Sequence, residues 1–225
     1  MTGPTARRPR PVWKRPRVIG GVVALAVLAA IAATTTTVSA SDPAAKAAAQ
    51  GGSTFDAKEY ATKHYDSEVV PTIQKNAQEL SALLPQIIDD PQAAGEKFGH
   101  RAGVSSPYAY AVKGEGVAGK VDGTLLPLKI DGVPDDVTVM LQIGPAINGT
   151  ALRDATGLVD FNDFLNQIEY ANAATELNNK VKSDVLADFD AKGAEGKTVR
   201  FVGAFAYGSN PAVLQVTPVE LEAKS

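Results

Sequence analysis

The sequence contains no cysteine among its 225 residues. It therefore forms no disulfide, offers no thiol nucleophile and binds no metal through thiolates. Its two histidines, His64 and His100, stand far apart in the sequence and form no H-x-x-x-H pair, so we expect no metal site. Because 44% of the residues are apolar, the chain has enough hydrophobic side chains for an ordinary globular core.

Catalytic motifs are missing as well. No Gly-x-Ser-x-Gly, P-loop or Ser-His-Asp order occurs. Gly114, Gly116 and Gly119 have the spacing of the dinucleotide-binding fingerprint, but strand-like residues follow them where a helix would be required. We expect these glycines to permit a tightly coiled strand, and we predict that the protein has no enzymatic activity and no cofactor.

The N-terminus has the order of a signal sequence. The first seventeen residues carry six positive charges and no acid, so the rest of the chain carries −9 within a total of −3. The uncharged apolar stretch 18–40 follows, and it ends in the small residues Val38, Ser39 and Ala40. Basic residues stay in the cytoplasm, so we expect everything after Ala40 to lie outside the cytoplasmic membrane. Export and the −9 charge both argue against a nucleic-acid partner.

Two fates are open for this apolar stretch. Its 23 uncharged residues are long enough for a membrane-spanning helix, which needs about 20. The small residues that end it also fit cleavage after Ala40 and secretion. We predict a single-pass anchor at 18–40, with a cytoplasmic tail at 1–17, and keep cleavage as the alternative. Residues 41–54 are rich in Ala, Gly, Ser and Gln, which predicts a flexible linker before an exported domain at 55–225.

The first part of this domain, residues 55–100, has helical spacing. Asp56 and Glu59 resemble a capping box, and apolar residues recur at helical intervals as far as Ile87. Pro71 must kink or restart that helix. Asp90 as N-cap and Pro91 at the first helical position predict a further helix that ends at Gly99.

The second part, residues 105–225, has the alternation of strands. Five such runs occur, at 108–121, 125–130, 137–143, 198–207 and 213–221. A long helix from about Asn162 to Phe189 separates the third from the fourth, with Asp160 as its N-cap. Its apolar stripe is formed by Phe161, Phe164, Leu165 and Ile168.

This order predicts an α+β protein: N-terminal helices followed by an OB-like five-stranded barrel. The long helix lies between strands three and four, and in this fold type it closes one end of the barrel. The alternative is an unrelated half-open sheet packed on helices.

Polar side chains are dense between residues 142 and 170. A guanidinium group, planar amides and an aromatic face are the groups that recognise sugar hydroxyls and rings. The candidate ligand-binding residues are Arg153, Asp154, Asn162, Asn166, Gln167 and Tyr170. In the alternative interpretation, the amides only cover the solvent face of the helix, and Arg153 pairs with Asp154 in a loop.

Three blocks of this sequence resemble a known family. They are Phe55-Asp-Ala-Lys-Glu-Tyr60, the stretch 143–170 and Gly196-Lys-Thr-Val-Arg-Phe-Val-Gly-Ala-Phe205, in this order. Together they resemble the predicted periplasmic lipoproteins of domain of unknown function 2291. The resemblance implies an exported, membrane-attached protein, often encoded beside sugar ABC transporters of the ribose type and without an established activity. The family typically carries a lipidated cysteine after the apolar segment, and this chain has none.

Two functions follow as hypotheses. The first is a non-enzymatic accessory module that binds a component of a sugar ABC transporter, or a small sugar, outside the cytoplasmic membrane. The alternative is an enzyme that acts on envelope carbohydrate with paired carboxylates, drawn from Asp154, Asp163 and Glu169.

Overall fold

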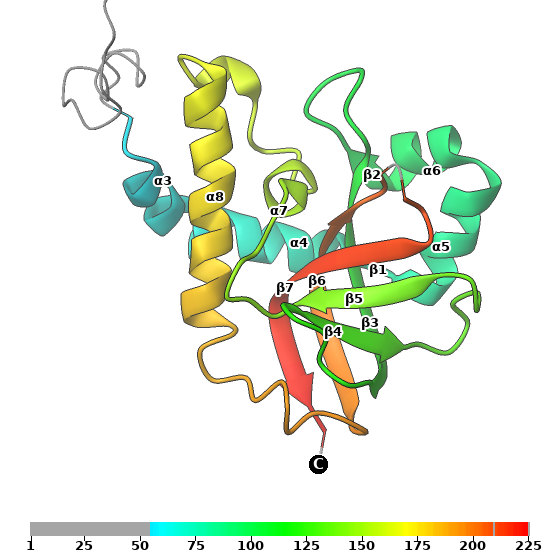
Figure 1. Cartoon of the computed structure of the whole chain (residues 1–225). Helices are drawn as coiled ribbons and strands as arrows, with labels where there is room; N and C mark the ends of the chain where they lie inside the picture. Colours follow the sequence, from blue (N-terminus) through cyan, green and yellow to red (C-terminus); the bar gives the residue numbers. More distant parts are fainter. Residues whose placement is uncertain (1–54, 209, 225) are drawn as a thin grey trace, which may run out of the picture. The chain divides into compact units, whose positions relative to one another are not determined.

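Five strands in the second half of the chain close into a barrel (Figure 1). The structure is a computed structural model, and it describes residues 55–208 and 210–224. The barrel strands are β3 (Ala109–Ala118), β4 (Leu125–Lys129), β5 (Thr138–Gln142), β6 (Thr198–Ala206) and β7 (Val213–Ala223). Their order is β3-β4-β5-β7-β6, and β6 pairs back onto β3. Among these five strands only the β5–β7 pair is parallel, so the connectivity is that of an OB fold and the predicted fold is confirmed.

Strand alternation sorts the side chains between two cores. On β3, Tyr110 and Val112 belong to the cluster inside the barrel, whereas Ala109 and Ala111 belong to a cluster on its outer face. The glycines of the same strand allow the neighbouring chain to approach the backbone of β3 closely, as expected. A Cβ on Gly116 would lie 2.5 Å from the carbonyl oxygen of Lys129 on β4.

The helical part is more divided than predicted. Its elements are α3 (Ala57–His64), the π-helical turn η2 (Tyr65–Val69), α4 (Val70–Asn76), α5 (Leu80–Asp89) and α6 (Pro91–Phe98). Asp56 and Asp90 cap α3 and α6 as expected, each accepting two backbone N–H groups. The helix restarts at α4, where Pro71 occupies the first turn.

Two very short strands join this part to the barrel. After α4 the backbone becomes extended, and β1 (Gln78–Glu79) pairs in parallel with β3. Following α6, β2 (Gly99–His100) pairs with β3 in the antiparallel sense. Both pairings lie on β3, so the helices are fixed against one strand of the barrel.

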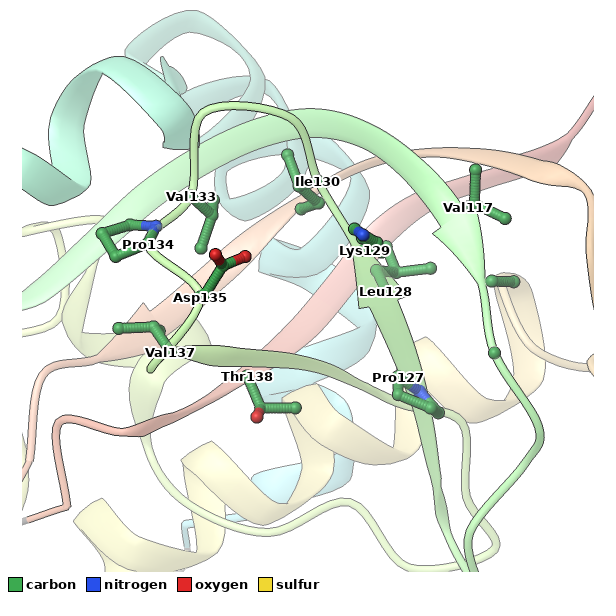
Figure 2. Close-up of a pocket in the computed structure, with 12 residues that line it drawn as sticks. Val117, Pro127, Leu128, Lys129, Ile130, Val133, Pro134, Asp135, Val137 and Thr138 are labelled. Atoms are coloured by element: carbon green, nitrogen blue, oxygen red, sulfur yellow. The ribbon is translucent and has the colours of Figure 1, made fainter.

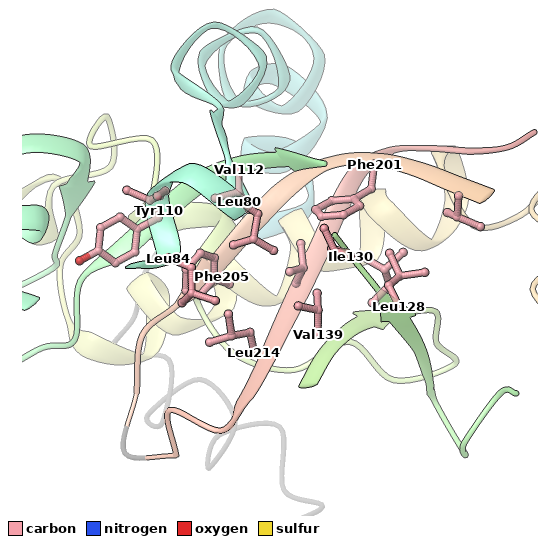
Figure 3. Close-up of a cluster of buried hydrophobic side chains, with 14 of the residues drawn as sticks. Leu80, Leu84, Tyr110, Val112, Leu128, Ile130, Val139, Phe201, Phe205 and Leu214 are labelled. Carbon is pink, nitrogen blue, oxygen red and sulfur yellow. The ribbon is translucent and has the colours of Figure 1, made fainter. Parts of the chain in front are cut away.

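The barrel interior is completed by α5 (Figure 3). Leu80, Leu83, Leu84 and Ile87 of this helix are at most 1% exposed and pack with the inward residues of the strands. The helix between strands three and four was expected to close the barrel, and here the structure differs. That helix, α8 (Gln167–Asp184), buries Leu177 and Val181 in the outer cluster, against α3, η2 and the outer face of the sheet.

This long helix is also shorter than the predicted span 162–189. Its N-cap is Asn166, and Asp160 instead caps a short 3-10 helix, η3 (Phe161–Asp163). Of the predicted apolar stripe only Phe164 is buried, while Phe161, Leu165 and Ile168 are exposed. The stripe prediction was therefore wrong, because its residues do not share one helix: Phe161 lies in the 3-10 turn, Phe164 and Leu165 lie in the loop that follows, and Ile168 lies in α8.

The basic tract 1–17, the apolar stretch 18–40 and the linker 41–54 lie outside the described residues. Within residues 55–208 and 210–224, no helix has both the length and the hydropathy that a membrane span requires.

Candidate functional site

The structure brings three of the predicted ligand-binding residues together. Arg153 and Asp154 lie on the short helix α7 (Ala151–Asp154), and Tyr170 lies in the first turn of α8. The Arg153 side chain is 5% exposed, and its Cζ lies 3.4 Å from the centroid of the Tyr170 ring. Its Nη1 donates a hydrogen bond of 2.8 Å to the Tyr170 carbonyl oxygen.

Asp154 completes this buried cluster. One of its carboxylate oxygens, Oδ1, accepts from Arg153 Nε at 2.7 Å, and the other accepts from the Thr150 hydroxyl at 2.6 Å. Burial raises the pKa of the Tyr170 phenol, although the positive charge of Arg153 acts in the opposite direction. That phenol donates to the carbonyl oxygen of Val159. The polar groups of the cluster are thus occupied by one another and hold residues 155–166 against α7 and α8.

The three amides of the predicted set have different positions. Asn166 accepts from the backbone N–H groups of Ile168 and Glu169 and so caps α8. Asn162 donates to the Asp160 carboxylate, and Gln167 is exposed in the first turn of α8. Sugar binding by the six residues stays a prediction. Asn162 and Gln167 are the two members that reach solvent without a structural bond to the helix backbone.

The three carboxylates of the enzyme hypothesis have different surroundings in the structure. Asp154 is paired with Arg153, and Glu169 is 6% exposed with one oxygen accepting from the Leu165 backbone N–H at 2.8 Å. The other oxygen, Oε1, is buried without a hydrogen-bond partner. Asp163 is exposed. A glycosidase needs two carboxyl groups that face the same substrate. The geometry of Asp154 and Glu169 is that of two groups which hold the local fold.

The two histidines also have structural neighbours. His64 Nδ1 lies 3.0 Å from Glu68 Oε2, one helical turn further along. The ring of His100 packs on the backbone of Gly157, where an added Cβ would lie 2.6 Å from it. In the part of the chain that the structure describes, no three His, Cys, Asp or Glu side chains gather where they could hold a metal ion.

A cleft that the sequence analysis missed lies on the barrel where β3, β4 and β5 meet (Figure 2). Its volume is about 580 Å³. Most of its lining side chains are aliphatic or proline, and Figure 2 shows the Asp135 carboxylate among them. The residues that shape the cleft are Val117, Pro127, Leu128, Ile130, Val133 and Val137.

The cleft follows from a short strand pairing. β3 and β4 pair only at Val117 with Lys129 and at Ala118 with Leu128. The turn from Ile130 to Val137, which follows β4, bounds the hollow. Pro127 lies in β4, where its missing N–H weakens the ladder further. Its carbonyl oxygen still accepts from Gly119 at 2.9 Å.

The chemistry of this cleft favours an apolar peptide segment. No aromatic side chain lines it, although aromatic faces are the usual partners of sugar rings. Lys129 and Asp135 supply one charge of each sign at an otherwise aliphatic surface, and Thr138 supplies a hydroxyl. In OB folds the face of the second and third strands is a common binding surface, and here these strands are β4 and β5.

Val117 is the residue through which the sequence could have indicated this site, because it is apolar and lies on a face of the predicted strand that points away from the barrel interior. In the structure it is 50% exposed. Alternation alone places it correctly on the outer face of β3. That a hollow forms beside it depends on tertiary pairing, which alternation does not encode.

Comparison with known proteins gives two matches. A family model described as predicted periplasmic lipoprotein, domain of unknown function 2291, matches residues 22–222. The crystal structure of an OB-fold protein from Thermotoga maritima is 25% identical in sequence, with a TM-score of 0.62. The similarity covers 76% of this chain and 100% of that one, and it agrees with the closed barrel. No curated protein matches the chain.

Proposed function

This chain belongs to the family of predicted periplasmic lipoproteins, and on that premise we propose that it is a non-enzymatic binding module held outside the cytoplasmic membrane. The match over residues 22–222 confirms the resemblance found in the sequence. The family description points to a membrane-attached, extracytoplasmic protein and specifies no reaction. The proposed module binds an extended apolar segment of a partner protein in the cleft between β3, β4 and β5.

The apolar stretch 18–40 is the proposed anchor. Because the chain has no cysteine, it offers no thiol for the lipid that a lipoprotein carries. A single-pass helix at 18–40, preceded by the basic tract, would provide the attachment instead. Cleavage after Ala40 is the competing outcome, and it would release the domain.

The observation that carries the proposed binding role is the aliphatic cleft itself. Val117 is 50% exposed, and it lines the hollow together with Leu128 and Ile130, which are 5% and 7% exposed. Apolar side chains that bind there would leave water and gain about 25 cal/mol per Å² of buried apolar area. Lys129 and Asp135 at the rim would orient the incoming segment through their opposite charges.

A subunit of a sugar ABC transporter is the proposed partner. This choice rests on the family resemblance, since the cleft indicates only an apolar peptide. A small sugar is the alternative ligand, and the exposed amides of Asn162 and Gln167 are the side chains to test for it.

Affinity purification tests the proposal directly. The tagged full-length chain is purified from native membranes, and the proteins that accompany it are quantified by mass spectrometry against an unrelated tagged anchor. Val117→Asp places a charge in the cleft at a residue whose exposure keeps the fold intact. The matched control is Val104→Asp, which lies in a loop, is 85% exposed and does not line the cleft.

We expect transporter subunits with the wild type and with Val104→Asp, and at least tenfold less with Val117→Asp. Equal recovery with both variants would refute the cleft as the binding site. Recovery of nothing above the control anchor would refute the accessory role. Binding of sugars to the purified chain, lost in Asn162→Ala with Gln167→Ala, would favour the sugar ligand.

A further inference from the structure

Exposed apolar side chains gather at one end of α8. The described residues include seven large apolar side chains that are exposed, and four of them fall between residues 158 and 168. We name these four the tip patch: Leu158, Phe161, Leu165 and Ile168, with exposed fractions of 51%, 42%, 71% and 50%. Soluble proteins normally scatter such residues singly, so a cluster of this kind marks a contact surface.

The tip patch is held in place by its own segment. Phe164, between the exposed residues, is 8% exposed and packs its ring against Tyr170 and Phe55. Asp160 caps the η3 turn and Asn166 caps α8, so both ends of the loop are fixed. The exposure of Leu165 and Ile168 is therefore a property of the folded segment.

The chain enters the domain beside this patch. Phe55 is the first described residue, and its ring centroid lies 5.2 Å from that of Phe164. Residues 41–54 precede it, and the flexible linker predicted for them from their composition would span roughly 20 Å on average. A helical anchor at 18–40, the part of the proposed function on which this inference rests, therefore keeps the tip patch within reach of the bilayer surface.

We propose that the tip patch docks on the outer surface of the lipid bilayer that anchors the chain. Leu, Phe and Ile side chains are suited to the boundary between headgroups and acyl chains. The anchor confines the domain to the membrane, so a small patch suffices, because tethering raises the effective concentration to the millimolar range. Docking in this way orients the barrel relative to the membrane.

The surrounding charge specifies the lipid. Asp160 and Asp163 are exposed within the same segment, and they would be repelled by anionic headgroups. Insertion of the apolar side chains is thus the driving force, and zwitterionic lipid is sufficient. We expect the contact to be insensitive to salt, in contrast to a basic membrane-binding surface.

A lipid surface fits the patch better than a protein does. A stable protein interface buries roughly 800 Å² on each partner. Four partly exposed side chains in one short segment supply much less, whereas shallow insertion into a bilayer needs only a few apolar side chains.

The absence of cysteine allows a direct test. The full chain is reconstituted in phosphatidylcholine vesicles, and a single cysteine is introduced at Gln167, between Leu165 and Ile168, for an environment-sensitive fluorophore. Ala187→Cys is the matched control, because this exposed residue lies beyond the other end of α8. The 18 residues of that helix separate the two labels by about 27 Å.

Quenching by lipids that carry a nitroxide near the headgroup is the measurement. We expect the label at 167 to be quenched at least threefold more than the label at 187, at both low and high salt. Leu165→Gln with Ile168→Gln should reduce quenching at 167 to the level at 187. Equal quenching of the two labels in the otherwise unchanged chain would overturn the proposal. If the label at 167 is shielded only when a transporter subunit is reconstituted with the chain, the patch is a protein interface and the proposal is overturned.

Alkaline extraction of the same vesicles separates this inference from the anchor. A chain that resists extraction while its label at 167 stays unquenched has an anchor and no docking patch. A chain released by extraction has no anchor, and quenching at 167 before extraction would then show that the patch binds lipid by itself.

Discussion

Arg153 lies over the ring of Tyr170 while its Nη1 bonds to the carbonyl oxygen of the same residue. One side chain on α7 thereby contacts both the ring and the backbone in the first turn of α8. Asp154 neutralises the guanidinium group from the other side. This buried arrangement makes the Arg153 cluster a structural joint between two helices, and its loss should be felt in stability.

Arg153→Ala is expected to lower the free energy of unfolding by about 3–5 kcal/mol, because it leaves the carboxylate of Asp154 buried without its partner. Arg101→Ala is the control. Arg101 also stacks on a tyrosine, Tyr108, and bonds a backbone carbonyl, but it is only partly buried, so we expect a loss below about 1 kcal/mol. Urea unfolding followed by circular dichroism measures both. Similar losses would contradict the structural role of Arg153.

Gly116→Ala should strain the barrel. The new Cβ would lie 2.5 Å from the Lys129 carbonyl oxygen and 2.7 Å from Ile130 Cγ1, so β3 and β4 must move apart. We expect a loss of about 1–3 kcal/mol in thermal or urea unfolding. At Gly103 the nearest atom to the same change is 3.8 Å away, so Gly103→Ala should be neutral or slightly stabilising. An unchanged stability in Gly116→Ala would show that β3 and β4 can move apart at this position at no measurable cost.

Asn166→Ala removes the cap of α8. Its side chain satisfies two backbone N–H groups, and we expect a loss of about 1–2 kcal/mol, with lower helical signal in circular dichroism. Asn162→Ala, in the same segment but bonded only to Asp160, should cost less than half as much. If the two variants lost the same stability, the helix would not depend on this cap.

The Lys180–Asp184 pair predicts a pH dependence. Partial burial pushes the pKa of Asp184 upward, but the hydrogen bonds from Lys180 and Ser183 outweigh this effect and lower the pKa. A carboxyl group whose pKa is lowered by folding stabilises the protein at neutral pH, and this contribution is lost as the pH falls through the folded pKa.

Asp184→Asn should therefore cost about 0.5–1 kcal/mol at pH 7. Its unfolding curve should approach that of the wild type once the pH has fallen through the lowered pKa of Asp184, which lies below the ordinary value of 3.8. Asp188→Asn removes a neighbouring exposed carboxylate as a control for total charge. A constant difference between Asp184→Asn and the wild type from pH 7 to pH 3 would show that the effect is not electrostatic.

The positions of the strands were predictable from the sequence because stretches of them alternate between buried and more exposed residues. In β5, Val139 and Leu141 alternate with more exposed residues, and in β6 Val199 and Phe201 do the same. This period of two does not depend on which strands pair. The order of strands and helices along the chain, which is that of an OB fold, therefore followed from local information. The Asp90-Pro91 helix start was equally local.

The start of α8 was not predictable in the same way. Phe161, Phe164, Leu165 and Ile168 match helical spacing, but Asn166 competes with helix formation by accepting the N–H groups of the next turn. The side chains that α8 buries are of mixed kind, so its apolar periodicity in the sequence is weak. They include Glu169 and Asn178 beside Ala173, Ala174 and Leu177.

The candidate site shows a similar limit. Arg153 and Tyr170 were singled out for their chemistry, but their burial depends on a contact between residues 17 positions apart. Nothing in the local pattern distinguishes a buried arginine from one that is open to a ligand. The cleft at Val117 was missed because its lining comes from three strands and a turn, which are brought together only by tertiary pairing.

The dependence of the barrel interior on α5 bears on how the chain folds during export. Residues 80–87 would leave the membrane before any barrel strand, yet the core around their leucines is incomplete until β6 and β7 are outside. The closing pair joins Ala109 to Ala206, so almost the whole domain must be translocated before the barrel can form. We expect nascent chains that stop before β6 to be sensitive to proteases and to need a holding chaperone on the outer side of the membrane.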